Sequence, residues 1–235
     1  MVSEDPWRRL ISQFLEFVSS LDLLARGAES ELRKGHYYGV PAVYKLRRRK
    51  EYMDPSLDSD LRRARTLKEA KVLSVASRAN IPVPLLLAVY PSIGLLVMQY
   101  IEGERLKEAL DRGVSGHCDL ARRAGAILGM LHEHGISHGD PTTSNYIITD
   151  SGDLYIIDFG LADFTSEIED LAVDIHLFRR AVSSSHARLA EDLARCFIEG
   201  YSSVRGEKAR PVIERAEEIM LRGRYVEERR TVWKP

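Results

Sequence analysis

The chain has 235 residues, of which 44% are hydrophobic and 29% are charged, and its formal net charge is −1. This length allows one large domain or two small lobes with a sizeable core, and the composition is that of an ordinary globular protein. The near-neutral charge argues against a global affinity for nucleic acid or membranes, so any electrostatic partner has to be argued from local patches.

Two sequence features bear on the compartment. Cys118 and Cys196 stand far apart and form no CxxC or Cys/His cluster, which argues against a zinc site and against a disulfide framework. Two unpaired thiols fit a reducing cytoplasm. The first residues contain no apolar run of the kind that a signal peptide has, so no signal peptide is predicted. The uncharged stretch 81–101 approaches the length of a membrane span, but prolines and a glycine interrupt it. Two buried strands joined by a turn are therefore predicted there, with no membrane partner.

In chain order, the spacing of apolar residues predicts an amphipathic helix at the start of the chain, followed by a sheet-rich region. Three strand-like runs are separated by turn glycines, and a basic loop leads into a long helix and two more strands. The expected ranges are helix 6–20, strands 21–28, 30–36 and 40–47, loop 48–56, helix 57–78 and two strands within 83–101.

After residue 102 the pattern becomes mainly helical. Helices are predicted at 106–110 and 119–133, two short strands at 146–149 and 154–159, and mostly helix from 168 to 225. The chain is therefore divided into an N-terminal helix (1–20), an N-lobe (21–101), a reduced helical C-lobe (102–221) and a basic tail (222–235).

The segment 138–160 carries the chemistry. Asp140 is followed by Asn145 after four residues, and Asp158 begins an Asp-Phe-Gly string after a predicted hairpin. Transfer of a γ-phosphoryl group needs positioning and charge neutralisation more than covalent help, and Mg²⁺ prefers oxygen ligands. This spacing is typical of kinases, so we expect Asp140 to be catalytic and Asn145 and Asp158 to bind magnesium.

A kinase also needs a lysine on its third strand and a glutamate on the next helix. Lys45 and Glu69 stand at those places. Either residue alone is more typical of a solvated surface charge, but the two together favour a catalytic ion pair.

The adenine and phosphate contacts are less clearly marked. Residues 95–103 resemble a kinase hinge, with Met98 as gatekeeper and the backbone of Gln99 and Ile101 facing adenine. The chain has no GxGxxG string, but Gly27 with Ala28, Glu29 and Ser30 allows a tight turn whose N–H groups face the phosphates of ATP.

Several strings together make the resemblance specific. They are "RGAES", "VYKLRRRKEYMDPSLD", "HGDPTTSN", "IIDFGLADFTSEIEDLAVDIHLFRRA" and "LRGRYVEERR". From about Gly27 to Arg230 the chain resembles the small atypical serine/threonine kinase subunit of the KEOPS (EKC) complexes, which is related to the RIO kinases. The resemblance implies an α+β, protein-kinase-like bilobal fold with an antiparallel N-lobe sheet and one long helix. It also implies use of ATP and Mg²⁺.

The same resemblance implies the biological setting. It implies a cytoplasmic role, in an archaeon or a eukaryote, in making threonylcarbamoyladenosine in tRNA. The implied partners are the threonylcarbamoyl-transferase subunit, other KEOPS subunits and, through the complex, tRNA. Pro141 departs from the family, which generally has Leu there, and it removes an N–H from the catalytic loop.

Some features separate this chain from ordinary protein kinases. Gly139 replaces the Arg that precedes the catalytic Asp, and no Ala-Pro-Glu follows Gly160. ATP hydrolysis, or phosphorylation of a group held by a partner, therefore fits better than a freely diffusing peptide substrate. Asp174 has two open readings, as an anchor for the catalytic-loop backbone or as an ordinary carboxylate at a helix start.

Two basic stretches are candidates for partner contacts. Residues 45–71 hold ten Lys or Arg against five Asp or Glu, and the tail from Arg222 is also basic, although such runs are usually solvated faces. Two alternatives to a KEOPS kinase or ATPase stay open. One is a small-molecule phosphotransferase of the aminoglycoside type, and the other is a scaffold whose nucleotide site is structural.

Overall fold

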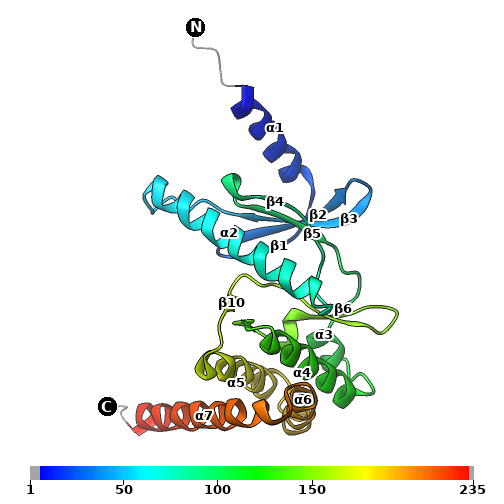
Figure 1. The fold of residues 1–235 in the computed structure, drawn as a ribbon, viewed down its shortest axis with the longest axis vertical. Helices are drawn as coiled ribbons and strands as arrows, with labels where there is room; N and C mark the ends of the chain where they lie inside the picture. Colours follow the sequence, from blue (N-terminus) through cyan, green and yellow to red (C-terminus); the bar gives the residue numbers. More distant parts are fainter. Residues whose placement is uncertain (1–5, 233–235) are drawn as a thin grey trace. The chain divides into compact units, whose positions relative to one another are not determined.

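The computed structural model describes the backbone of residues 6–232 and the side chains of residues 6–222 (Figure 1). The chain forms two compact units. Unit 1 comprises Met1–Lys71 and Leu85–Tyr100, and unit 2 comprises Val72–Pro84 and Ile101–Pro235. Helix α2 (Pro55–Arg78) therefore contributes residues to both units.

Unit 1 is an antiparallel sheet with helices, as the sequence predicted. Its helix α1 spans Pro6–Ser20, and its five strands have the order β1-β2-β3-β5-β4. The strands are β1 (Asp22–Arg26), β2 (Ser30–Tyr37), β3 (Val40–Arg47), β4 (Leu86–Tyr90) and β5 (Leu95–Gln99), with a 3-10 turn η1 (Pro91–Ile93) between the last two. The uncharged stretch 81–101 thus forms two strands, and no helix in the described part of the chain is long and apolar enough to cross a bilayer.

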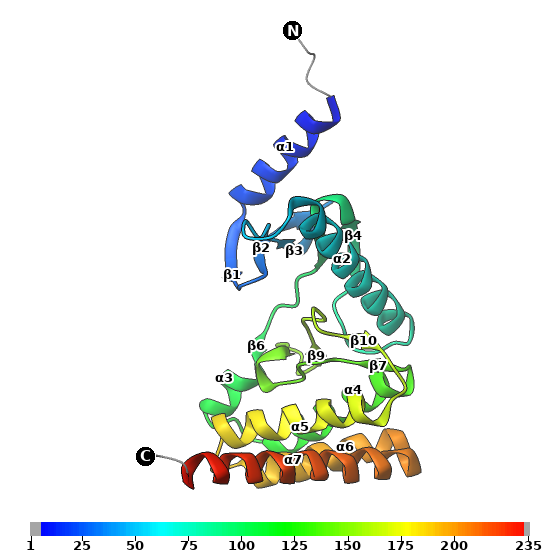
Figure 2. The same cartoon turned by 90° about the vertical axis from the view of Figure 1, so that its left-hand side faces the viewer.

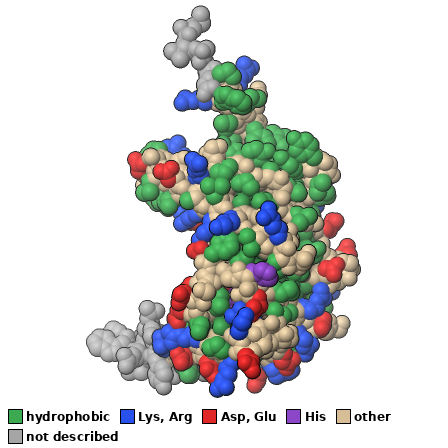
Figure 3. All heavy atoms as spheres, in the orientation of Figure 1, with side chains coloured by type: hydrophobic (Ala, Val, Ile, Leu, Met, Phe, Trp, Pro, Cys, Tyr) green, Lys and Arg blue, Asp and Glu red, His purple; other side chains and the backbone are tan. Residues whose placement is uncertain are grey.

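Alternation along β5 gives the sheet its two buried faces. Leu95 and Val97 pack in one cluster with Val18 of α1, whereas Leu96 and Met98 pack in another with Ala70 of α2. Successive side chains of a strand point to opposite faces, so α1 and α2 cover opposite faces of this sheet. Figure 3 shows hydrophobic side chains on the surface of unit 1. Leu10, Phe17 and Leu23 are among the exposed large hydrophobic residues of this unit.

Unit 2 is mainly helical, also as predicted. Its helices are α3 (Leu106–Asp111), α4 (His117–Glu133), α5 (Ile168–Ser185), α6 (Ala190–Arg205) and α7 (Ala209–Val232), and 3-10 turns η2 (Thr143–Asn145) and η3 (Gly206–Lys208) connect elements. Figure 2 shows α5 and α7 running alongside each other. A three-stranded sheet has the order β6 (Glu104–Arg105), β8 (Tyr146–Ile148), β9 (Leu154–Ile156), and β7 (Ile136–Ser137) pairs with β10 (Asp163–Phe164). The two-residue strands β6, β7 and β10 are too short to give a periodic signal in the sequence.

Glycines allow α4 and α6 to pack closely. A Cβ on Gly125 would lie 1.9 Å from the carbonyl oxygen of Phe197, and one on Gly200 would lie 1.8 Å from that of Arg122. Real Cβ atoms do not approach backbone oxygens so closely, so any larger residue at either position would push the two helices apart.

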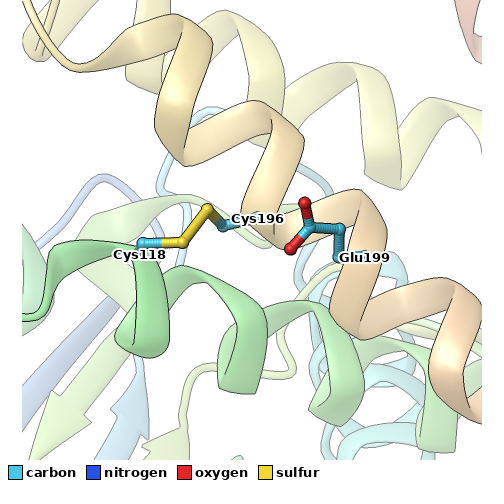
Figure 4. A group of neighbouring side chains, drawn as sticks. All are labelled: Cys118, Cys196 and Glu199. Carbon is cyan, nitrogen blue, oxygen red and sulfur yellow. A yellow bond between two sulfur atoms is a disulfide. The ribbon is translucent and has the colours of Figure 1, made fainter.

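The prediction of two free thiols is wrong. Cys118 on α4 and Cys196 on α6 form a disulfide with a Cα–Cα distance of 5.4 Å, within the range that disulfides require. The sequence prediction failed because it considered only local spacing, whereas the packing of α4 against α6 joins residues 78 apart. Figure 4 shows Glu199 beside the disulfide. Because both sulfur atoms are in the disulfide, neither is a thiolate ligand for a metal in this state.

Of the predicted basic tail (222–235), only Arg222 has a described side chain, and the rest lies outside the described side chains. Its role as a partner contact therefore stays a prediction.

Candidate active site

Unit 1 brings Lys45 and Glu69 together. The Lys45 Nζ donates to Glu69 Oε1 at 2.7 Å, and the two residues are only 5% and 2% exposed. Val43 packs against the α2 side of the sheet, and Lys45 lies two residues further along β3 on the same face. Strand alternation therefore directs Lys45 toward α2, where Glu69 lies.

Arg47 is a third member of this buried group that the sequence analysis missed. Its Nη2 donates to Glu69 Oε2 at 2.5 Å, and Arg47 is 5% exposed. The signal was present in the sequence, because Arg47 stands two residues after Lys45 on the same strand and thus on the same face. Each oxygen of the Glu69 carboxylate has its own cation, which fixes the orientation of the carboxylate.

The loop 27–30 forms a tight turn, closed by a hydrogen bond from the Gly27 N–H to the Ser30 carbonyl at 2.9 Å. The Glu29 carboxylate accepts hydrogen bonds from Lys50 Nζ at 2.9 Å and from Arg65 Nη1 at 2.7 Å. The hydrogen bond from Lys50, followed by that from Arg65, lowers the pKa of Glu29 to about 2. The Glu29 side chain is thus held by cations of unit 1, and the phosphate-binding role of this loop stays a prediction.

In the predicted hinge, Met98 is buried and packs with Leu96 and Ala70. The Gln99 N–H donates to the Leu85 carbonyl at 2.8 Å, so it is used within unit 1. Ile101 is buried at the start of a segment of unit 2.

Unit 2 brings Asp140 and Asn145 together. The Asn145 Nδ2 donates to the Asp140 carbonyl at 2.8 Å and to Asp140 Oδ2 at 2.9 Å. The intervening turn is closed by bonds from the Thr142 N–H to the Asp140 carbonyl and from the Asn145 N–H to the Thr142 carbonyl, both at 2.9 Å. None of these bonds needs an N–H at position 141, so Pro141 is compatible with the paired arrangement.

Asp158 comes two residues after β9, the second strand of the hairpin that follows Asn145. The Ile157 N–H donates to the Asn145 carbonyl at 2.9 Å, which fixes the backbone next to Asp158 against the catalytic loop. Asp158 has a φ of +64°, in the left-handed region that residues other than glycine rarely adopt. Such conformations persist where the surroundings hold them, often at functional sites. Phe159 anchors the turn, because it is buried with its ring centroid 4.8 Å from that of His138.

Asp174 on α5 supports the catalytic loop. Its Oδ2 accepts the His138 N–H at 2.6 Å and its Oδ1 accepts the Gly139 N–H at 2.7 Å, and the side chain is fully buried. Of the two readings of Asp174, the structure therefore supports the anchor. Gly139 has a φ of +80°, and a Cβ there would lie 2.6 Å from the Leu161 carbonyl oxygen. Both facts require glycine where ordinary kinases have Arg.

A buried chain of hydrogen bonds in turn holds the Asp174 carboxylate. His132 Nε2 lies 3.1 Å from Asp174 Oδ2, and His132 Nδ1 lies 2.8 Å from the Tyr201 hydroxyl. Because a carboxylate only accepts, the proton of His132 resides on Nε2, and Tyr201 donates to Nδ1. Burial lowers the pKa of His132, against an opposing effect of Asp174, so the ring stays neutral. Helices α4, α5 and α6 thereby fix the catalytic loop together.

Unit 1 thus holds the buried lysine–glutamate pair, and unit 2 holds the Asp140, Asn145 and Asp158 set. Three features together define an atypical protein kinase. They are the kinase-like sheet unit, this carboxylate and amide set, and the lack of both GxGxxG and the Arg before Asp140.

Comparisons with known proteins lead from this class to one family. A family model described as "ABC1 atypical kinase-like domain" matches residues 60–193. KEOPS complex subunit Bud32 from Pyrococcus abyssi is 40% identical over 215 residues, covering 88% of this chain and 97% of that protein. The chain belongs to the family of KEOPS Bud32 subunits, which confirms the resemblance seen in the sequence.

Two further comparisons concern the length of a relative and the fold. A bifunctional tRNA threonylcarbamoyladenosine biosynthesis protein from Methanothermobacter thermautotrophicus is 36% identical over 222 residues, and the match covers 94% of this chain but only 40% of that protein. The structure of a Rio2 kinase–ADP/Mg²⁺–phosphoaspartate complex from Chaetomium thermophilum has a TM-score of 0.58 at 16% identity, covering 91% of this chain and 75% of that one. This likeness shows the fold and confirms the predicted kinase-like fold.

Proposed function

We propose that the chain is an ATP- and Mg²⁺-dependent atypical kinase or ATPase that supports threonylcarbamoyladenosine formation in tRNA as part of a KEOPS complex. The observation that carries the proposal is the catalytic loop, in which Asp174 holds the backbone before Asp140 while Asn145 bonds to Asp140 itself. A loop fixed from both sides presents its carboxylate in one orientation, which is what phosphoryl transfer requires of a protein.

The roles of the residues follow from their chemistry. Asn145 uses its Nδ2 on Asp140, so its Oδ1 is the atom suited to Mg²⁺, and the Asp158 carboxylate supplies a second oxygen ligand. When bound, Mg²⁺ neutralises charge on the phosphates of ATP. Lys45, oriented by Glu69, places an ammonium group for the phosphates. The backbone of Ala28, Glu29 and Ser30 offers N–H donors, whereas the Gly27 N–H closes the turn on the Ser30 carbonyl. Met98, Gln99 and Ile101 are proposed to line the adenine site.

Asp140 is proposed to orient the attacking group, a water or a hydroxyl, and to accept its proton. The Asn145 hydrogen bond on Oδ2 leaves Oδ1 as the oxygen for that proton. The chain has no Ala-Pro-Glu string after Gly160, so we propose hydrolysis of ATP or phosphorylation of a group that a partner holds in place.

The partner assignment rests on the relatives. The Pyrococcus relative is named a KEOPS complex subunit, and the longer Methanothermobacter relative is named bifunctional. We propose that this chain works with a threonylcarbamoyl-transferase subunit that corresponds to the remainder of that longer protein, and with tRNA through the complex. A cytoplasmic location is part of the same proposal.

Substitution of Asp158 tests the reaction directly. Asp158→Ala should abolish ATP turnover at any Mg²⁺ concentration while the protein still unfolds cooperatively. Asp150→Ala is the matched control, because Asp150 is an exposed carboxylate in the hairpin turn of the same segment, and it should keep wild-type turnover. Wild-type turnover in Asp158→Ala would refute the magnesium assignment.

A further inference from the structure

A second charged site lies in unit 1, in a pocket between the end of β3 and the first turns of α2. Five basic side chains line it, from Arg47, Arg48, Lys50, Arg62 and Arg65, against the two carboxylates of Glu29 and Asp58. The lining therefore carries three more positive than negative charges. A concave surface with one excess sign concentrates ions of the opposite sign.

Arg47 forms the buried part of this pocket. It is 5% exposed, and among the described residues its Nε has no hydrogen-bond partner. Buried donors are nearly always satisfied, and an unsatisfied one calls for a missing partner. The Arg47 guanidinium also shares the Glu69 carboxylate with Lys45. The unsatisfied Arg47 Nε is therefore a buried donor that an acceptor atom of a ligand in this pocket would satisfy.

Most of the remaining cations are already oriented by neighbours. Lys50 and Arg65 hold Glu29, and Arg62 Nε donates to Asp58 Oδ2 at 2.8 Å. Arg48 is different, because its side chain is 49% exposed and its only described ion pair, with Glu31, is long at 3.7 Å. Such an exposed pair contributes little, so Arg48 is the side chain that can turn onto a ligand at the least cost.

We propose that this pocket is a binding site for a phosphate group, which contacts the buried side chain of Arg47 and the exposed side chain of Arg48. A phosphate dianion matches the excess positive charge, and its several oxygens accept the forked donors of arginine, which suit phosphate better than a single ammonium does. The same chemistry is available from free inorganic phosphate or from a phosphate monoester. All residues that line this pocket belong to unit 1, whereas the proposed magnesium ligands belong to unit 2.

Arg48 and Arg49 provide a matched pair for the test. Both are exposed, adjacent and equal in charge, but only Arg48 lines the pocket. The binding of inorganic phosphate to the full chain is measured by calorimetry at pH 8 and constant ionic strength, with chloride as the balancing anion. Arg48→Met should weaken phosphate binding about tenfold or more, as expected for the loss of a charge-assisted hydrogen bond, and Arg49→Met should change it less than about twofold. The readout requires no ATP turnover, so it stands apart from the proposed catalytic function.

The other outcomes are decisive as well. If both variants bind phosphate as the wild type does, any bound phosphate lies elsewhere, and if both lose affinity equally, only the general surface charge attracts it. Either result overturns the proposal, as does the absence of phosphate binding to the wild type. O-phosphoserine, measured in parallel, identifies the source of the phosphate group. Binding tighter than that of inorganic phosphate supports a monoester, and weaker binding supports the free ion.

Discussion

Removal of the Cys118–Cys196 disulfide should strongly destabilise unit 2. The bond closes a loop with a sequence separation of 78 residues, for which the loss of unfolded-state entropy corresponds to about 4.5 kcal/mol. For a chain of this size each kcal/mol shifts the melting temperature by about 2–4 °C, so reduction should lower it by about 10–15 °C. The assay is thermal unfolding followed by circular dichroism, with and without a thiol reductant.

The double variant Cys118→Ala/Cys196→Ala is the control for this prediction. It should melt close to the reduced wild type and should not respond to the reductant, since it has no disulfide to lose. The glycine contacts between α4 and α6 should keep the two helices packed in the reduced protein, so its helical signal at low temperature should remain. An unchanged melting temperature on reduction, with free-thiol titration confirming that reduction occurred, would refute the reasoning.

Three further predictions concern single features. Asp174→Asn removes a buried carboxylate that accepts two backbone N–H groups, so urea unfolding should show a loss of about 3 kcal/mol together with reduced ATP turnover; unchanged stability would contradict the anchor role. Glu29, with its pKa lowered to about 2, stabilises the folded state fully above its ordinary pKa and loses this effect as pH falls toward 2. The difference in melting temperature between the wild type and Glu29→Gln should therefore be constant near neutral pH and shrink below about pH 4.5, and a difference that grows on acidification would be inconsistent with it. Deletion of the tail 222–235 should preserve stability and ATP binding but reduce threonylcarbamoyl incorporation into tRNA by the reconstituted complex, more so at low salt; a large fall in melting temperature would instead indicate that the tail packs on unit 2.

Local patterns in the sequence predicted most of the fold. Strand alternation and turn glycines gave β1, β2 and β3, and helical periodicity gave α1, α2 and α4, because each of these signals depends on neighbouring residues only. The Asp140–Asn145 pair was predictable for the same reason, since the two residues belong to one turn. Lys45 and Glu69 came from the known order of kinase elements rather than from physical reasoning about their distance.

The features that the sequence did not reveal depend on tertiary packing. The disulfide requires α4 and α6 to lie side by side, which two cysteines 78 residues apart cannot indicate by themselves. The chain of hydrogen bonds from Tyr201 through His132 to Asp174 likewise requires three helices to pack together. Arg47 is an intermediate case, because alternation along β3 places it beside Lys45, but its burial depends on α2 covering that face.

The central claim is that Asp140 performs chemistry in an ATP-consuming site. The most direct test is phosphate release from ATP by the purified chain, alone and with its transferase partner and tRNA, for the wild type and Asp140→Asn. Asp140→Asn should keep nucleotide affinity within a few-fold and lose turnover by about 10² to 10⁴-fold, the usual contribution of a positioned acid–base group. Equal turnover in the two proteins, or equal losses of affinity and turnover in the variant, would contradict the claim.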